Sequence, residues 1–283
     1  MTNRLALDHL TVTDTIPSQL VEVAAEVGCE AVCLFMRPMD VLPRMPHFEL
    51  IGATAERRET RMRCEDLGVG IDLVYPFTLA GGTDIGAFLP ALETAAYLGA
   101  RAVNVLIYDR NPTRRLDAFG SFCGLVAAHD LEVAVEFYPL SQIRTLGEAL
   151  DLVGQRLPGK GGINVDLLHL KRSGGEVSEL AAAPADLIRY AQYCDGVAIV
   201  EQSQWAWEAS SQRVLPGAGV FDLAAFARAL PQDVRASVEL PQEDALSSGL
   251  PVVERARRAV TAVRAAIEPV RGLASSATLF KFK

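Results

Sequence analysis

Four apolar runs of the sequence each end in one polar side chain that carries an oxygen acceptor. These four residues are Glu136, Asp166, Gln192 and Glu239. Carboxylate and amide oxygens are hard donors, which favour Mg²⁺ or Mn²⁺ over zinc. Such a cation stabilises the negative charge that develops when a proton leaves the carbon next to a carbonyl. The residue types therefore indicate a metal site for proton-transfer chemistry.

The alternation of side chains along an extended strand decides which way these residues point. In the segment "LEVAVEFYP", Val133, Val135 and Phe137 share one face. Ala134 and Glu136 share the other face. If the branched residues face an outer layer of helices, Glu136 points inward. The same alternation turns the other three polar residues inward.

Three of the four residues are carboxylates, and carboxylates that converge on one site repel one another. At an effective dielectric constant near 20, two unit charges about 4 Å apart repel by roughly 4 kcal/mol. No Lys or Arg stands at the matching strand ends, so a divalent cation is the expected counter-charge. We expect one Mg²⁺ or Mn²⁺ ion, with coordination positions open for substrate or water.

The fold must bring the ends of these consecutive runs together. Eight β-rich apolar runs alternate with helical stretches, and each changeover carries Gly, Pro, Asn or Asp. The expected strands are 5–12, 30–36, 69–75, 102–108, 131–137, 162–166, 187–193 and 235–240. Eight such units in 283 residues favour a single-domain α/β protein, the (β/α)8 TIM barrel. A doubly wound sheet is the alternative, but no G-x-G-x-x-G motif follows the first run.

No change of composition and no Ser/Gly-rich linker divides the chain. We expect the barrel over residues 1–268 and a C-terminal extension over residues 269–283. The extension contains "LASSATLFKFK", an apolar stretch that could pair with another subunit. A homodimer and a homotetramer are both left open.

The overall charge argues against anionic macromolecules as partners. With a net charge of -8 and an isoelectric point near 5.1, nucleic acid and anionic membranes would repel the chain. Neither a signal peptide nor a run of about 18 apolar residues is found, so we expect a cytoplasmic protein. Five cysteines without C-x-x-C spacing indicate reduced, mostly buried thiols.

The order of the motifs "VEFYP", "NVDLLHL", "YAQYCD", "LPGAGVFDLAAF" and "SVELP" resembles the xylose isomerase-like barrel superfamily of sugar phosphate isomerases and epimerases. The resemblance covers essentially the whole chain. It implies substrate contacts from His169 and Arg213, and a guanidinium beside a Pro-Gly loop suits a carboxylate or phosphate. The metal ligands that it implies are Glu136, Asp166, Gln192 and Glu239.

Two residues are similar to the 3-dehydroshikimate dehydratase branch of this superfamily. Gln192 stands where the epimerases more often have His, and His169 lies three residues after Asp166. Thr78 departs from that branch, where an Arg is expected. The resemblance therefore implies an isomerase or epimerase that acts on a small polyhydroxylated carbonyl compound, with a dehydratase as the alternative.

Glu136 and Glu239 are the expected base and acid, because each would keep one carboxylate oxygen within reach of a metal-bound substrate. His169 could donate to a substrate oxygen or assist a leaving hydroxyl. Return of the proton to the opposite face gives epimerisation, and return to the neighbouring carbon gives isomerisation. Loss of a β-hydroxyl gives dehydration.

Further residues could line the substrate pocket. Arg37, Tyr75 and Asn104 stand at or near the ends of other expected strands. Trp205 and Trp207 lie in the long segment after the seventh strand, where alternate spacing would turn both rings the same way. The two rings could cover the pocket as a lid or pack on another subunit.

Two other function classes are alternatives to the enzyme. Endonuclease IV-type DNA repair uses a related barrel, but its metal cluster needs many His ligands and this chain has 4 His. A non-catalytic barrel that binds a small molecule is the other alternative, since a barrel can lose its catalytic activity and keep its fold. Metal binding discriminates between the catalytic and the non-catalytic barrel.

Overall fold

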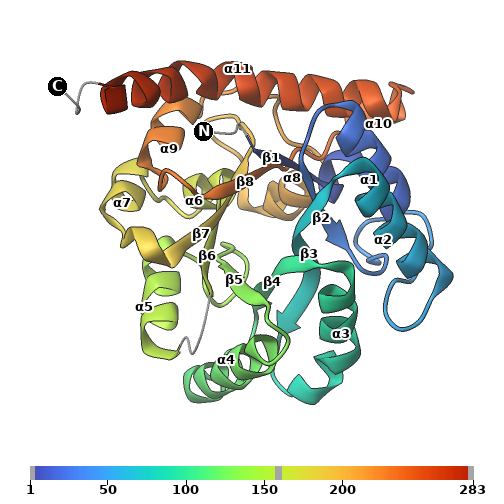
Figure 1. The fold of residues 1–283 in the computed structure, drawn as a ribbon. Helices are drawn as coiled ribbons and strands as arrows, with labels where there is room; N and C mark the ends of the chain where they lie inside the picture. Colours follow the sequence, from blue (N-terminus) through green and yellow to red (C-terminus); the bar gives the residue numbers. More distant parts are fainter. Residues whose placement is uncertain (1–3, 157–160, 280–283) are drawn as a thin grey trace.

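The computed structural model describes residues 4–156 and 161–279. In these residues eight parallel strands form one closed barrel in chain order, with β8 paired to β1 (Figure 1). The predicted single-domain TIM barrel is confirmed. The strands are β1 (Leu5–Asp8), β2 (Ala31–Phe35), β3 (Gly70–Leu79), β4 (Ala100–Ile107), β5 (Glu132–Glu136), β6 (Gly161–Asp166), β7 (Ile188–Tyr193) and β8 (Arg235–Val238).

Helices connect the strands on the outside of the barrel. The longer ones are α1 (Pro17–Glu26), α2 (Ala55–Leu67), α3 (Leu89–Leu98), α4 (Pro112–Ala127), α5 (Leu146–Arg156), α9 (Leu223–Ala229) and α11 (Val252–Leu279). The shorter ones are α6 (Leu167–Arg172), α7 (Val177–Ala182), α8 (Trp205–Ser210) and α10 (Glu243–Ser247), with 3-10 turns η1 (His9–Val12), η2 (Ile85–Phe88), η3 (Ala185–Leu187) and η4 (Gln202–Gln204). Four short elements, η1, α6, α8 and α10, follow the carboxyl ends of strands.

Local sequence signals set several of these helix ends. Pro17 is the first residue of α1, where its missing N–H costs no helical hydrogen bond. Gly99 follows α3 with a φ of 73°, a left-handed conformation that glycine adopts without strain.

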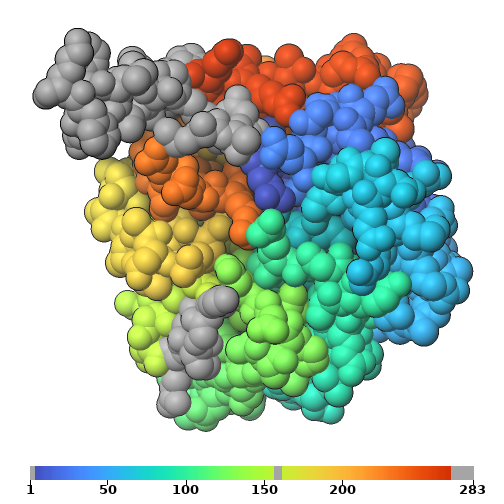
Figure 2. Space-filling view, in the orientation of Figure 1, coloured from blue at the N-terminus to red at the C-terminus, as the bar shows by residue number. Residues whose placement is uncertain are grey.

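Helix α11 closes the ring of helices. It lies beside α1 and α9, so the last helix packs against the first one (Figures 1 and 2). Its inward face is fully buried because it carries small and branched side chains, namely Ala256, Ala259, Val260, Val263 and Ile267. The helix continues across residue 268, and the predicted division at that point stays a prediction. Residues 280–283 of the expected pairing segment lie outside the described residues.

Two strand boundaries differ from the sequence prediction. The first strand stops at Asp8, because the Asp8 side chain accepts the N–H of Leu10 at 2.9 Å and starts η1. The third strand continues to Leu79 instead of stopping at Tyr75. The other six strands agree with the prediction within two residues at each end.

Two further expectations concern the cysteines and membranes. All five cysteines are free and buried, as the sequence predicted. Among the described helices, none combines the length and the apolar content needed to span a bilayer.

Candidate active site

The carboxyl ends of the strands surround a cavity of about 410 Å³. Its polar lining comes mainly from strands β4, β5, β7 and β8 and from the segments that follow β6 and β7. The residues with amide, carboxylate, imidazole or guanidinium groups are Asn104, Glu136, His169, Gln192, Arg213 and Glu239. The strand alternation predicted that Glu136, Gln192 and Glu239 point inward, and all three reach this cavity.

Glu136, Asp166 and His169 form a group that could hold a metal ion, because one ligand atom from each lies within 4.8 Å of the others. His169 Nε2 is 3.4 Å from Glu136 Oε1 and 3.8 Å from Asp166 Oδ2. Two carboxylates and an imidazole are a donor set that divalent cations accept, zinc included. The chemistry of the residues therefore fits a divalent metal.

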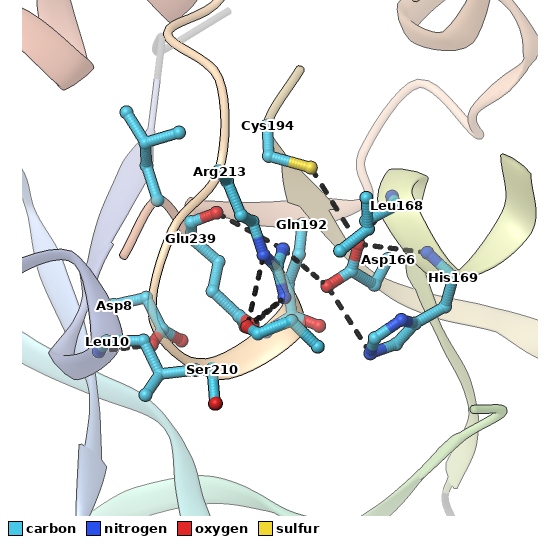
Figure 3. A network of polar contacts seen from close by, with 12 residues as sticks. Asp8, Leu10, Asp166, Leu168, His169, Gln192, Cys194, Ser210, Arg213 and Glu239 are labelled. Carbon is cyan, nitrogen blue, oxygen red and sulfur yellow. Dashed lines mark hydrogen bonds and ion pairs between the residues drawn. The ribbon is translucent and has the colours of Figure 1, made fainter. Parts of the chain in front are cut away.

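Asp166 has a second role that fixes its position. It ends β6 and caps α6, since its Oδ1 accepts the N–H of Leu168 at 2.6 Å and the N–H of His169 at 3.4 Å. Such a cap satisfies backbone donors that a helix start leaves open. The direct passage from strand to helix places His169 next to the carboxylate that caps its own helix (Figure 3).

Arg213 enters the acidic cluster from the segment between β7 and α9. Its Nη1 is 2.8 Å from Asp166 Oδ2, and its Nη2 is 2.6 Å from Glu239 Oε1 (Figure 3). The side chain is 1 % exposed. The sequence placed Arg213 at the open mouth as a substrate contact, whereas the structure places it between two buried carboxylates.

Every N–H of the Arg213 guanidinium has an acceptor within the protein. Besides the two carboxylates, Nε and Nη2 donate to the carbonyl of Ala209 at 3.3 and 3.1 Å. Nη1 also donates to the carbonyl of Glu239 at 3.2 Å. An arginine has five N–H donors, so this group is fully used.

The pKa values of the two carboxylates that contact Arg213 are shifted in opposite directions. Burial alone would raise the pKa of Asp166, but the Arg213 charge, His169 and the Leu168 N–H outweigh burial and hold that pKa below its usual value. Burial raises the pKa of Glu239 well above its usual value, and neighbouring carboxylates add to the effect of burial. Glu239 lacks the backbone donors that Asp166 has, so one shared cation does not compensate for its burial.

Three amide side chains connect Glu136 to Glu239. Asn164 uses its Nδ2 to donate to Asn104 Oδ1 at 3.1 Å and to Gln192 Oε1 at 2.6 Å. Asn104 in turn donates to Glu136 Oε2 at 2.5 Å, and Gln192 donates to Glu239 Oε2. We call Asn104, Asn164 and Gln192 the amide relay. Both of its outer members present N–H groups to the carboxylates.

Asn164 fixes this orientation, although the sequence analysis did not single it out as a site residue. It is fully buried, and its Oδ1 has no hydrogen-bond partner. Suppose that each of the three side-chain amides exchanged the positions of its oxygen and its nitrogen. The Asn164 Oδ1 atom would then accept two N–H groups, and Gln192 would present its carbonyl to the cavity. The predicted role of Gln192 as a metal ligand needs that exchange, because its oxygen now faces Asn164.

Asp8 is another residue that the sequence analysis missed. It ends β1, is fully buried and accepts the hydroxyl of Tyr75. Burial raises the pKa of Asp8 to about 7, against the opposing effect of the Tyr75 hydrogen bond. Its signal was present, because Asp8 ends an apolar run as Glu136 does.

Three predicted pocket residues do not line the cavity. Arg37 is exposed, and Trp207 is 47 % exposed. Trp205 donates its ring N–H to the Val200 carbonyl at 3.0 Å. The expectation that both rings turn the same way is wrong, because they lie in helix α8, where residues two apart point in different directions. Tyr75 does line the cavity, as expected.

The segment that carries Arg213 is organised by Asp195, which follows β7. Its carboxylate accepts four backbone N–H groups, from Gly196 and Phe221 on one oxygen and from Gly217 and Gly219 on the other. A Cβ on Gly219 would lie 2.2 Å from this carboxylate. The Pro-Gly motif noted in the sequence is therefore the wrapping of a loop around one buried aspartate.

No protein-family model matches this sequence, and no curated protein matches it. Solved structures do match its fold. One is a xylose isomerase-like TIM barrel/4-hydroxyphenylpyruvate dioxygenase fusion protein, with a TM-score of 0.77 and 20% identity over 97% of this chain. This chain spans 44% of the length of that fusion protein. The fold is that of the xylose isomerase-like TIM barrels.

Other barrels of this kind are matched over nearly their whole length. The IolI protein, solved with a bound zinc atom, has a TM-score of 0.77 and 16% identity over 94% of this chain and 99% of its own. D-psicose 3-epimerase has a TM-score of 0.71 and 12% identity over 93% and 99%. The probable 3-DHS dehydratase AsbF from Bacillus anthracis has a TM-score of 0.68 and 18% identity over 91% and 98%.

Proposed function

We propose that this protein is a divalent-metal-dependent isomerase or epimerase that moves a proton next to the carbonyl of a small hydroxylated substrate. The observation that carries the proposal is the convergence of Glu136, Asp166 and His169 beyond β5 and β6, with one ligand atom from each within 4.8 Å of the others. Two proteins that share the fold support this proposal: IolI binds a zinc atom, and D-psicose 3-epimerase is named as an epimerase.

Glu136 and Asp166 are the residues that we expect to hold the metal in any case. Gln192 and Glu239 complete the set expected from the sequence, and His169 is the third member of the group that already lies within reach. Mg²⁺ and Mn²⁺ remain the proposed ions. A bound cation would supply Lewis-acid stabilisation of the developing enolate charge.

The protein itself would handle the proton. Glu239 lines the cavity and suits the acid. Glu136 lines the same cavity and suits the base. Arg213 holds one Glu239 oxygen at 2.6 Å and orients it. That Arg213 also contacts the substrate stays a prediction.

Dehydration is the second candidate, and one observation favours it. The His169 ring lines the cavity 3.4 Å from Glu136 and packs against the Tyr138 ring with centroids 4.7 Å apart. An imidazole held in this way could protonate a leaving hydroxyl. The AsbF neighbour supports this reading. A protein that binds neither Mg²⁺ nor Mn²⁺ would favour the non-catalytic barrel. The cytoplasmic location and the oligomeric state stay predictions.

Glu136→Gln tests the proposal. Loss of a proton-transfer group typically costs about 10²- to 10⁴-fold in turnover, and we expect a loss of this size together with weaker Mn²⁺ binding. The matched control is Glu132→Gln at the opposite end of the same strand. Deuterium uptake into substrate from heavy water would indicate isomerisation, and a new enone or aromatic ultraviolet band would indicate dehydration. Wild-type turnover in Glu136→Gln would refute the role of this residue.

A further inference from the structure

We infer that the substrate is uncharged and amphipathic, with a hydroxy-ketone head at the acidic floor of the cavity and an apolar ring against the wall formed after β2 to β5. This inference rests on the proposed function for the head of the substrate. It adds the chemical class of the rest of the molecule, which neither the reaction type nor the fold specifies.

We infer an uncharged substrate because the cationic side chains of the cavity are already paired within the protein. Among the described lining residues, Arg213 and His169 are the ones that carry or can carry positive charge. Every N–H of Arg213 is engaged inside the protein, with Asp166 and Glu239 as its carboxylate partners. His169 faces Glu136 and Asp166. A phosphate or carboxylate on the substrate would have to displace one of these pairs.

The acidic floor works in the same direction. Glu136 and Glu239 line the cavity, and Asp8 and Asp166 lie buried behind it. A hydroxyl of a neutral hydroxy-ketone can donate a hydrogen bond to a carboxylate oxygen, whereas a phosphate or carboxylate group has no proton to donate to it.

The opposite half of the cavity is apolar. Its aliphatic and phenylalanine side chains come from the segments that follow β1 and β2 and from β2, β3 and β4. They are Leu10, Phe35, Met39, Leu42, Phe77 and Leu106. A sugar bound against these six side chains would place hydroxyls against carbon, and unpaired polar groups lose their hydration without compensation. The lining therefore favours a substrate whose body is hydrocarbon.

Aromatic rings favour a cyclic body over a chain. Phe35 and Tyr75 meet edge to face with ring centroids 4.5 Å apart, and Tyr108 and Tyr138 stand after the next two strands. Rings of this kind bind flat hydrocarbon faces by stacking or edge contacts. In the closed barrel, β7 and β8 lie opposite β3 and β4, so the ends of β7 and β8 lie across the cavity from Tyr75 and Tyr108.

Three probes with the same head and different bodies test the inference. They are dihydroxyacetone, dihydroxyacetone phosphate and 2-hydroxyacetophenone, titrated into the full-length protein by calorimetry with Mn²⁺ present. We expect 2-hydroxyacetophenone to bind about 10- to 50-fold more tightly than dihydroxyacetone, as burial of one apolar ring would produce. The phosphate should bind no more tightly than dihydroxyacetone.

The outcomes separate the inference from the proposed function. If dihydroxyacetone or its phosphate binds at least as tightly as the phenyl ketone, the inference is overturned while the proposed hydroxy-carbonyl site stands. If none of the three binds, the proposed function and the inference fail together.

A pair of variants locates the ring. Met39→Gln puts an amide into the wall at nearly constant volume, and it should lower the ratio of the phenyl-ketone affinity to the dihydroxyacetone affinity about fivefold or more. The matched control is Met62→Gln on α2, where the side chain is 57 % exposed. An unchanged ratio in Met39→Gln, with binding otherwise intact, would contradict the placement of the ring.

Discussion

Arg213 lies between Asp166 and Glu239, with its two terminal nitrogens 2.8 and 2.6 Å from the two carboxylates. A monovalent guanidinium therefore supplies part of the counter-charge that the sequence assigned wholly to a divalent ion. The guanidinium and a metal ion would share one acidic cluster, so the binding of the metal should depend on this arginine.

Arg213→Met should make the protein depend on metal for stability. Removing one partner of a buried ion pair typically costs about 3–5 kcal/mol, because the remaining charges lose their compensation. Mn²⁺ should then recover more stability in the variant than in the wild type, by about 1–3 kcal/mol at saturating metal. Thermal unfolding with and without Mn²⁺ measures this difference.

The control for this variant is a second buried arginine. Arg172 binds Glu208 with 2.6 and 2.7 Å contacts, and both side chains are under 10 % exposed. Arg172→Met should lower stability without any added benefit from Mn²⁺. An equal response of both variants to Mn²⁺ would mean that Arg213 and the metal do not share the acidic cluster.

Asn164→Asp should increase the affinity for Mn²⁺. The new carboxylate cannot donate, so the amides of Asn104 and Gln192 would turn to donate to it. Gln192 would then present its oxygen to the cavity, and one such donor is worth about tenfold in affinity. Isothermal titration with Mn²⁺ measures the effect. The same substitution at the α4 cap, Asn111→Asp, should leave Mn²⁺ binding alone. If Asn164→Asp binds Mn²⁺ no more tightly than the wild type, the amides of Asn104 and Gln192 do not turn as proposed.

Asp195→Asn should loosen the segment that carries Arg213. One amide cannot accept the four backbone N–H groups that the carboxylate accepts, and buried donors left open cost about 1–3 kcal/mol each. We expect a loss of about 2–4 kcal/mol in urea unfolding, together with faster proteolysis between residues 196 and 221. Asp222→Asn, at the exposed cap of α9, should be nearly neutral because Asn also caps helices well. If the two variants lose the same stability, Asp195 does not organise the loop.

His9 should make the protein less stable in acid. Its Nε2 is 2.9 Å from the Thr15 carbonyl, and its Nδ1 accepts the N–H of Phe35 at 3.3 Å. Burial lowers the pKa of His9 from 6.5 to about 4. The unfolded chain therefore binds a proton between these values while the folded chain does not. This contribution is present above pH 6.5 and is lost as the pH falls towards 4.

Between pH 7 and pH 5 the His9 contribution should fall by about 2 kcal/mol. Urea unfolding at the two pH values should show a smaller difference in His9→Gln than in the wild type. His47→Gln, which changes an exposed histidine, should keep the wild-type difference. If the stability of His9→Gln changes with pH as much as that of the wild type, His9 is not the source of the change.

The strand-borne part of the site could be predicted because alternation is a local property. Glu136, Gln192 and Glu239 reach the cavity as their positions in the strands required. The same reasoning could have included Asp8, which also ends an apolar run. The role of Asn164 could not be predicted, because it depends on which way three amides turn, and that is settled by their mutual contacts.

The loop-borne part could not be predicted, because its conformation depends on distant contacts. Arg213 reaches Asp166 because the loop wraps around Asp195. No local sequence pattern predicts the contact between Arg213 and Asp166. Trp205 and Trp207 were misplaced for a related reason. An extended loop and a short helix give opposite answers for residues two apart, and "EQSQWAWEASS" has no strong signal for either.

The five buried cysteines give this barrel a chemical reporter of its own motions. Burial raises the pKa of Cys29 and Cys123 to about 12 and that of Cys64 to about 11, so these sulfurs are almost entirely thiols at neutral pH. Alkylating reagents attack the thiolate and need access to it. The rate at which each sulfur is labelled should therefore report how often its own part of the barrel opens, with no probe added to the chain.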